Sequence, residues 1–222
     1  MKFFRWINIY GEKRSVLLNL DMTLYLVTEE SVPLNSLLNV VTQAIQGGVT
    51  IVQLREKNGS GKEFYEKAKI LKNLLDSYDI PLIINDRIDI AIAINAAGVH
   101  IGQTDLPLRI VKDIVPKSFI IGVSAGSLEE AKNAERDGAT YIGVGSVFPT
   151  STKEDAKLLP QGVLEEITKT VSIPVVAIGG IMIDNVDSLQ NIGIAGVAVV
   201  SAIMKADKPS IVAEKFLKKI KK

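Results

Sequence analysis

The stretch from Thr50 to Tyr78, TIVQLREKNGSGKEFYEKAKILKNLLDSY, contains one copy of the unit from which the chain is built. It begins with a short apolar run of β type and continues into a longer, mostly polar segment. In that segment apolar or aromatic residues recur at steps of three and four, at Phe64, Ala68, Leu71, Leu75 and Tyr78. Such spacing places the five side chains on one face of a helix. The stretch therefore predicts a strand followed by a helix that packs on it.

The same unit recurs along the chain. Eight apolar runs are found, at Thr23–Val27, Thr50–Leu54, Leu82–Ile84, Gly98–Ile101, Phe119–Val123, Tyr141–Val144, Val175–Ile178 and Val197–Val200. Glycines at 47, 48, 138 and 193 are placed to end helices in left-handed caps, and Ser127 with Glu130 forms a capping-box pattern. Strands that are apolar throughout need both faces buried, which indicates a parallel sheet covered by helices.

Eight strand–helix units predict an α/β fold, a single (β/α)8 TIM barrel that occupies residues 1–222. An open, doubly wound sheet would also satisfy the alternation. The barrel is favoured because the units average about 28 residues and no Gly-x-Gly-x-x-Gly motif follows the first strand. Residues 1–21 mix aromatic and charged side chains and are expected to form an extra N-terminal arm or helix packed outside the barrel. A helix on a membrane surface is the alternative for this segment.

Composition limits the function classes. The net charge of +1 gives no electrostatic footprint for nucleic acid or for an anionic membrane, so neither partner is expected. The chain has no cysteine and one histidine, His100, which excludes disulfides, thiolate metal sites and histidine clusters. These features fit a cytoplasmic protein, and they leave open whether it forms a homo-oligomer.

A barrel places its active site at the C-terminal ends of the strands, and polar residues follow the runs at that end. They are Gln53, Arg55, Lys57, Asn85, Asp86, Gln103, Asp105, Ser124, the loop Thr150-Ser151-Thr152-Lys153 and Ser201, and the glycine pair Gly179-Gly180 follows the seventh run. The loop offers three hydroxyls and an ammonium group, donors that suit a phosphate, although such a loop can also be an ordinary solvated turn. The sequence therefore predicts an anion site at this rim.

Three cations stand beside two carboxylates in this set. Arg and Lys side chains match phosphate oxygens, whereas Asp86 and Asp105 would repel a phosphate unless a hard divalent cation lay between them. Mg²⁺ held by one or two carboxylates and by phosphate oxygens answers that need. The combination predicts a pyrophosphate bound with Mg²⁺. The turns at Gly179-Gly180 and Val200-Ser201 fall where barrels often bind a separate monophosphate, which implies two phosphorylated substrates.

Each of these residues also has a structural interpretation. Asp86 and Asp105 could be helix N-caps, and Arg55 could form an exposed ion pair with Glu56. His100 is flanked by apolar residues, which favours a buried histidine with satisfied hydrogen bonds over a general base. The two glycines could be plain turn residues. What favours the functional interpretation is that all these groups are expected at one rim.

Six short motifs in the sequence together resemble those of a known enzyme family. They are QLREK at 53–57, ND at 85–86, HIGQTD at 100–105, GVS at 122–124, FPTSTK at 148–153 and IGGI at 178–181. In order and spacing they resemble the thiamine phosphate synthase family, over about Thr23 to Met204. The resemblance implies a transferase that joins 4-amino-5-hydroxymethyl-2-methylpyrimidine diphosphate to hydroxyethylthiazole phosphate, giving thiamine phosphate and pyrophosphate.

The resemblance also implies roles for individual residues. The pyrimidine diphosphate would be held by Gln53, Arg55, Lys57, Asn85, Ser124 and Lys153, of which Arg55, Lys57, Ser124 and Lys153 would be catalytic. The thiazole phosphate would contact Thr150, Ser151, Thr152, Gly180, Val200 and Ser201. The Mg²⁺ ligands would be Asp86 and Asp105. Pyrophosphate would leave first, and the thiazole nitrogen would then attack the resulting pyrimidine methylene cation, so that no strong base or protein nucleophile is needed.

Two residues depart from the family pattern. Gly126 stands where related sequences often carry histidine, and Ser146 stands where proline is common. The related thiazole tautomerase shares the barrel and uses a histidine in the first region, so glycine there argues against tautomerase activity. A barrel that binds thiazole or thiamine phosphate without turnover is the other alternative.

Overall fold

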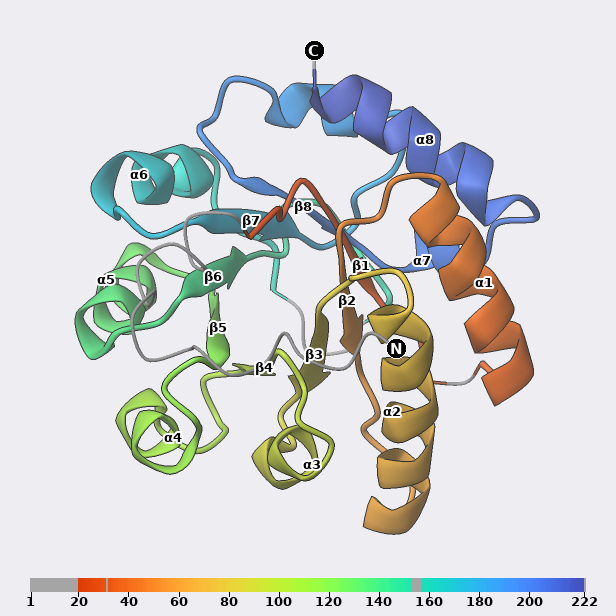
Figure 1. Cartoon of the computed structure of the whole chain (residues 1–222). Helices are drawn as coiled ribbons and strands as arrows, with labels where there is room; N and C mark the ends of the chain where they lie inside the picture. Colours follow the sequence, from red (N-terminus) through yellow and green to blue (C-terminus); the bar gives the residue numbers. More distant parts are fainter. Residues whose placement is uncertain (1–19, 31, 153–156, 222) are drawn as a thin grey trace.

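The computed structural model describes residues 20–30, 32–152 and 157–221, and its strands close into a barrel surrounded by helices (Figure 1). This confirms the predicted TIM-barrel fold. The strands are β1 Leu24–Val27, β2 Ile51–Leu54, β3 Leu82–Asn85, β4 Gly98–Ile101, β5 Ile120–Ala125, β6 Tyr141–Val144, β7 Val175–Ile178 and β8 Gly196–Val199. All neighbours are parallel, and β8 pairs with β1 through Leu24 and Val197.

The helices are α1 Leu34–Gln46, α2 Gly61–Asp76, α3 Ile88–Ala93, α4 Leu108–Ile114, α5 Leu128–Asp137, α6 Val163–Thr170, α7 Ser201–Met204 and α8 Pro209–Ile220. Between β7 and β8 stands a 3₁₀ helix, η2, at Val186–Leu189, where the other units carry α-helix. Three strands, β4, β6 and β7, have the predicted bounds, and the other five differ from the predicted runs by one or two residues at an end. The largest difference is in β5, which continues past Val123 and therefore includes Ser124.

Helix α2 shows why the pattern in the opening stretch predicts a helix, and where that pattern fails. Ser60 caps it with a full capping box, in which Ser60 Oγ accepts from Glu63 N–H and the Glu63 carboxylate accepts from Ser60 N–H. Phe64, Ala68, Leu71 and Leu75 are buried as predicted. The inclusion of Tyr78 was wrong, because the helix ends at Asp76 and Tyr78 is 41% exposed.

The other helix-end predictions hold in part. Gly138 is the left-handed cap of α5, with φ of 91°. Gly193 has a positive φ, but η2 ends four residues before it, so it caps no helix of the described chain. Ser127 accepts from Glu130 N–H (3.2 Å), whereas the Glu130 carboxylate accepts from Gly126 N–H (2.6 Å), so the reciprocal half of the predicted capping box is absent.

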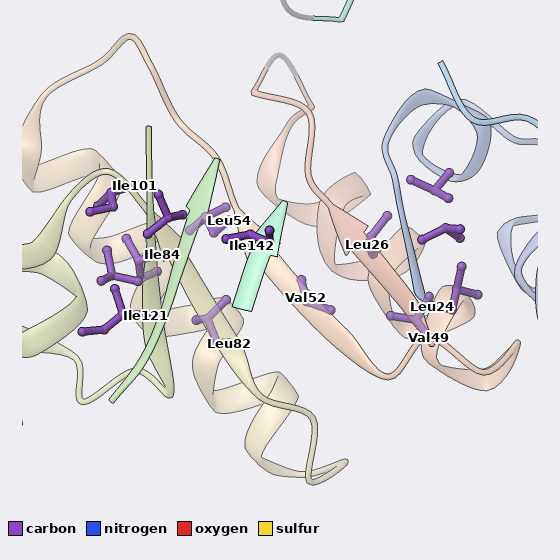
Figure 2. Packing of buried hydrophobic residues seen from close by; sticks show 14 of the residues in the cluster. Leu24, Leu26, Val49, Val52, Leu54, Leu82, Ile84, Ile101, Ile121 and Ile142 are labelled. Atoms are coloured by element: carbon purple, nitrogen blue, oxygen red, sulfur yellow. The ribbon is translucent and has the colours of Figure 1, made fainter. Parts of the chain in front are cut away.

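Two layers of apolar side chains hold the barrel together. The outer layer lies between strands and helices and includes Leu24, Leu26, Val52, Leu54 and Ile84 (Figure 2). The inner layer fills the barrel and consists of Met22, Tyr25, Val27, Ile51, Ile83, Tyr141, Val176 and Ala198. Because both faces of every strand are covered, uniformly apolar runs are the expected strand sequences.

Small residues inside the barrel make room for larger neighbours. Gly122 stands between His100 and Tyr141 in the strand register. A Cβ atom at Gly122 would lie 2.2 Å from Tyr141 Cζ and 2.5 Å from His100 Nδ1, closer than non-bonded atoms approach. Gly122 is thus required by space, and it fixes where the two rings lie.

The prediction of an arm at residues 1–21 falls almost wholly on residues 1–19, which lie outside the described residues. In the part of the chain that is described, no helix has both the length and the apolar character needed to cross a membrane.

Candidate active site at the barrel rim

The C-terminal ends of the strands surround a cavity of about 590 Å³. Twelve of the residues predicted as binding or catalytic groups line it: Gln53, Arg55, Lys57, Asn85, Asp86, Asp105, Ser124, Thr150, Thr152, Gly180, Val200 and Ser201. They come from seven different strand ends, so the closed barrel is what brings them together. Ser151 is exposed and is not among the lining residues, and Lys153 lies outside the described residues.

A second depression of about 630 Å³ lies on the outer surface at the start of α1 and α2. Its lining residues are Val32, Pro33, Leu34, Ser60, Lys62, Glu63, Glu66, Lys67 and Ile70. The strand ends do not contribute to it. The rim cavity is therefore the candidate active site, because it joins the catalytic end of the barrel to the predicted charged groups.

The two predicted metal ligands meet in the cavity. Asp86 follows β3 with a left-handed φ of 59°, and its N–H donates to the His100 carbonyl (2.8 Å). Asp105 accepts from Gly102 N–H (2.6 Å). Burial raises the pKa of Asp105 above its ordinary value, and the neighbouring Asp86 carboxyl raises it further. Two carboxyl groups thus face each other where a cation would relieve their repulsion.

The N-cap interpretation of these aspartates is wrong. Helix α3 begins at Ile88 after Arg87, and α4 begins at Leu108 after Pro107, and neither helix has a side-chain cap. Asp86 instead forms an ion pair with Lys57. Within the described ranges, no group of three or more His, Cys, Asp or Glu side chains is placed to hold a metal. A cation here would therefore need further oxygen ligands from substrate or water.

After β2, successive side chains point in alternate directions. Arg55 and Lys57 line the cavity, whereas Glu56 between them forms an ion pair with a residue of α2. Arg55 N–H donates to Thr28 Oγ1 (3.1 Å), which ties this segment to the end of β1. Glu56 pairs with Lys67 on α2 (2.5 Å), and the two side chains are only 10% and 16% exposed. The ion-pair partner of Glu56 is thus Lys67, and the proposed Arg55–Glu56 surface pair is not the one that forms.

We expect Lys67→Met to destabilise the protein by about 1–3 kcal/mol, because it leaves Glu56 without its partner in a mostly buried position. Burial already raises the pKa of Glu56, and Lys67 opposes that rise. Removing Lys67 raises the folded-state pKa further above the ordinary 4.5, so the loss should grow as pH rises through that range. Urea unfolding at pH 5 and pH 8 measures it. A larger loss at pH 5 would contradict the prediction.

Lys72→Met on the same helix is the matched control. Lys72 pairs with Asp76, whose side chain is 57% exposed, and an exposed pair of this kind contributes at most about 0.5 kcal/mol.

The loop after β6 is fastened to β7 at its base. Val147 N–H donates to the Ile178 carbonyl and Phe148 N–H to the Gly179 carbonyl, both at 3.0 Å. Ser146, one of the two departures from the family pattern, is buried and donates its hydroxyl to the Phe148 carbonyl (2.5 Å). These contacts hold the start of the loop that presents Thr150 and Thr152 to the cavity.

The Gly179-Gly180 turn needs glycine at both positions. The φ angles are 101° and 64°, and a Cβ atom at Gly180 would lie 2.4 Å from the Pro149 carbonyl oxygen. Asn185 clamps the turn by donating to the Gly180 carbonyl (2.9 Å) and accepting from Met182 N–H (2.8 Å). Sequence reasoning missed Asn185; its position shortly after a glycine pair was the one available signal.

A buried chain of hydrogen bonds runs beneath the cavity. Gln53 Nε2 donates to the Tyr25 hydroxyl (2.9 Å), which is 2.8 Å from the Tyr141 hydroxyl. The Tyr141 hydroxyl is 2.9 Å from His100 Nδ1, and His100 Nε2 is 3.0 Å from Ser124 Oγ. Burial raises the pKa of both phenols, so they stay neutral at physiological pH. The expectation that His100 is a buried, hydrogen-bonded histidine is confirmed.

The two tyrosines were missed by sequence reasoning. Each stands in an apolar strand run where its ring looks like ordinary core, and nothing local indicates that their hydroxyls meet across the barrel. The available signal is that a phenol buried in a strand needs a hydrogen-bond partner.

Comparison with known proteins agrees on one family. A family model described as thiamine monophosphate synthase matches residues 24–203. The thiamine-phosphate synthase of Methanobrevibacter smithii is 50% identical over 203 residues, which cover 91% of this chain and 97% of that protein. The corresponding protein of Clostridium tetani is 54% identical over 187 residues, which cover 84% and 90%.

Solved structures agree with this result. Thiamine phosphate pyrophosphorylase from Pyrococcus furiosus superposes with a TM-score of 0.83 at 39% identity and covers 92% of this chain and 98% of that one. A 3-hexulose-6-phosphate synthase superposes with a TM-score of 0.67 at 14% identity, over 89% of this chain and 99% of that one, a likeness of fold alone.

Proposed function

This chain belongs to the thiamine monophosphate synthase family, and on that premise we propose that it joins 4-amino-5-hydroxymethyl-2-methylpyrimidine diphosphate to hydroxyethylthiazole phosphate, releasing pyrophosphate. The observation that carries the proposal is the rim cavity, in which Arg55 and Lys57 stand beside the converging carboxyls of Asp86 and Asp105. Cations beside paired carboxylates suit a diphosphate that arrives with a divalent metal.

Mg²⁺ is the proposed cofactor, held by Asp86 and Asp105 and completed by oxygens of the diphosphate. These ligands fit Mg²⁺, because proteins usually bind this ion through one or two carboxylates and leave its other positions to water and substrate oxygens. When bound, it would supply charge neutralisation to the leaving pyrophosphate.

The residues of the chain supply binding and alignment. We assign Arg55 and Lys57 to the diphosphate oxygens, where their charge stabilises the pair of electrons that leaves with pyrophosphate when the C–O bond breaks. Lys153, outside the described residues, is proposed for the same task. Gln53, Asn85 and Ser124 would hold the pyrimidine. The thiazole nitrogen then donates its lone pair to the methylene carbon, forming the C–N bond, and no proton transfer is needed.

The second substrate is assigned to the opposite side of the rim. Thr150, Thr152, Gly180, Val200 and Ser201 line that part of the cavity, and Ser151 stands between the two threonines in the sequence. The N–H groups of a glycine turn can bind a monophosphate that side-chain cations do not reach. Holding both reactants without intervening water is the main source of acceleration expected from such a site.

We do not favour the tautomerase alternative, because Gly126 lines the cavity where that relative would need a histidine. A binding protein without turnover would have no use for paired carboxylates beside two cations. We propose a cytoplasmic enzyme of small-molecule metabolism, without nucleic-acid or membrane partners, that could assemble as a homo-oligomer.

The test mixes purified protein with both substrates and Mg²⁺ and follows thiamine phosphate and pyrophosphate. We expect the two products in equal amounts and their loss when EDTA is added. Binding of either substrate without product would favour the binding-protein alternative. Conversion of a thiazole carboxylate phosphate tautomer in place of coupling would favour the tautomerase.

A further inference from the structure

In the buried hydrogen-bond chain beneath the cavity, the donor and the acceptor can be assigned at each contact, starting from Gln53. Gln53 donates to Tyr25, so the Tyr25 oxygen is an acceptor at that contact and its single O–H proton is free to be given onward. The Tyr141 hydroxyl is the remaining partner recorded for Tyr25 in the described part of the chain. Tyr25 therefore donates to Tyr141. The opposite direction would leave a buried phenol proton without an acceptor, which is costly.

The same assignment of donors and acceptors continues through His100 to Ser124 at the cavity. Tyr141 accepts from Tyr25 and so donates its own proton to His100 Nδ1. His100 must then carry its proton on Nε2 and donate it to Ser124 Oγ. Ser124 accepts there, so its hydroxyl proton is left for the cavity. At the other end, the Gln53 amide donates one N–H of its NH₂ group to Tyr25, which fixes the orientation of the amide and presents its carbonyl oxygen as an acceptor for a ligand.

We infer that Tyr25, Tyr141 and His100 are positioning residues that lock Gln53 as an acceptor and Ser124 as a donor, and so make the site selective for an aminopyrimidine over an oxopyrimidine. This inference rests on the proposed function. A 4-aminopyrimidine offers one amino donor and ring-nitrogen acceptors, which complement these two groups. A 4-oxo analogue has nearly the same shape, but its oxygen accepts and its ring N–H donates.

The chain is suited to this task because its members are buried by packing at the floor of the cavity. Both phenols are at most 1% exposed, and His100 is 9% exposed. Gly122 and Gly143 leave space for the His100 ring and would clash with it or crowd it if they carried a side chain. A site whose buried donors and acceptors cannot turn round rejects the wrong pattern strongly, because each mismatch leaves a polar group unpaired.

The first test uses the single histidine of the chain. With ¹⁵N-labelled histidine, the imidazole spectrum contains one residue, and we expect a protonated Nε2 and an unprotonated, hydrogen-bonded Nδ1. Tyr141→Phe removes the donor to Nδ1 and should move that resonance, while Tyr78→Phe, at an exposed position, should not. A proton on Nδ1 in the wild type, or an unchanged spectrum in Tyr141→Phe, would overturn the inference.

The second test compares kcat/KM for the 4-amino and 4-oxo pyrimidine diphosphates. We expect the wild type to prefer the amino substrate by on the order of 100-fold or more. Tyr141→Phe and Tyr25→Phe, which cut the chain at successive links, should each lower that preference about tenfold, mainly through KM for the amino substrate. Tyr78→Phe should keep the wild-type ratio. Thermal unfolding of each variant confirms that it is folded.

The two tests separate the inference from the function on which it rests. If the wild type makes no thiamine phosphate, the proposed function fails, and the histidine spectrum still decides the direction of the chain. If the wild type is active and the preference is unchanged in both tyrosine variants, the function stands and the inference is wrong.

Discussion

Replacing Asp105 by asparagine is expected to lower kcat/KM for thiamine phosphate formation by about 100- to 1,000-fold without loss of stability. The neutral amide would take away one of the two proposed carboxylate ligands, and the charge stabilisation supplied through such a metal amounts to several kcal/mol. The asparagine oxygen can still accept from Gly102 N–H, as Asp105 Oδ2 does. The fall should therefore be chemical and not structural.

Stability provides the internal check. Burial raises the pKa of Asp105, which means that above the ordinary value of 3.8 the ionised form is less favourable in the folded protein than in the unfolded chain. Removing the charge relieves this cost at neutral pH, so the Tm should be unchanged or slightly higher.

Steady-state assays, calorimetric titration of Mg²⁺ with pyrophosphate present, and thermal unfolding measure these effects. Asp89→Asn is the matched control, since Asp89 is exposed on α3 and pairs with Arg87. Activity of Asp105→Asn within a few fold of the wild type would refute the assignment of Asp105 to the metal.

Gly122→Ala is expected to produce the largest loss of stability, about 3 kcal/mol. The new methyl group would overlap the Tyr141 ring and approach His100 Nδ1 inside the closed barrel, where both rings are hemmed in. Since neither ring can move far without breaking its hydrogen bonds, the steric strain cannot be relieved by a small shift of either side chain. For a chain of this size the Tm should fall by about 6–12 °C.

Gly126→Ala is the control, only four residues along the chain. A Cβ atom there would meet Glu130 Oε2 at 3.6 Å, an ordinary contact, so we expect less than about 0.5 kcal/mol of change. The comparison is made by urea unfolding of both variants. Equal stabilities for the two would show that the barrel interior adapts more easily than the packing indicates.

Much of the fold could be predicted because its rules are local. TIVQL at 50–54 reads as a strand buried on both faces, and the helix that follows shows its buried face at Phe64, Ala68, Leu71 and Leu75. Where local rules compete, prediction failed: the three- and four-residue spacing continues to Tyr78, but the helix stops at Asp76. Periodicity indicates a face and does not say where the last turn ends.

The candidate site, too, could be predicted from the sequence only in part. Asp86 and Asp105 could be placed at one rim because parallel strands of a barrel all end on the same side. The Tyr25–Tyr141 contact could not, because it depends on how far β1 is shifted relative to β6 across the barrel, and no pattern within either strand contains that information. Asn185 was missed for a similar reason, since its partner is a carbonyl group whose position is set by the fold of the Gly179-Gly180 turn.

The pairing of Leu24 with Val197 joins segments near opposite ends of the chain. During synthesis, β1 is made early, but its partner β8 is made near the end. The barrel therefore cannot close, and β1 keeps an unpaired edge, until most of the protein has been synthesised. The cavity that spans Gln53 to Ser201 is likewise incomplete until then. A chain interrupted before β8 would thus expose an unpaired strand edge that favours aggregation, and it would lack part of the substrate site.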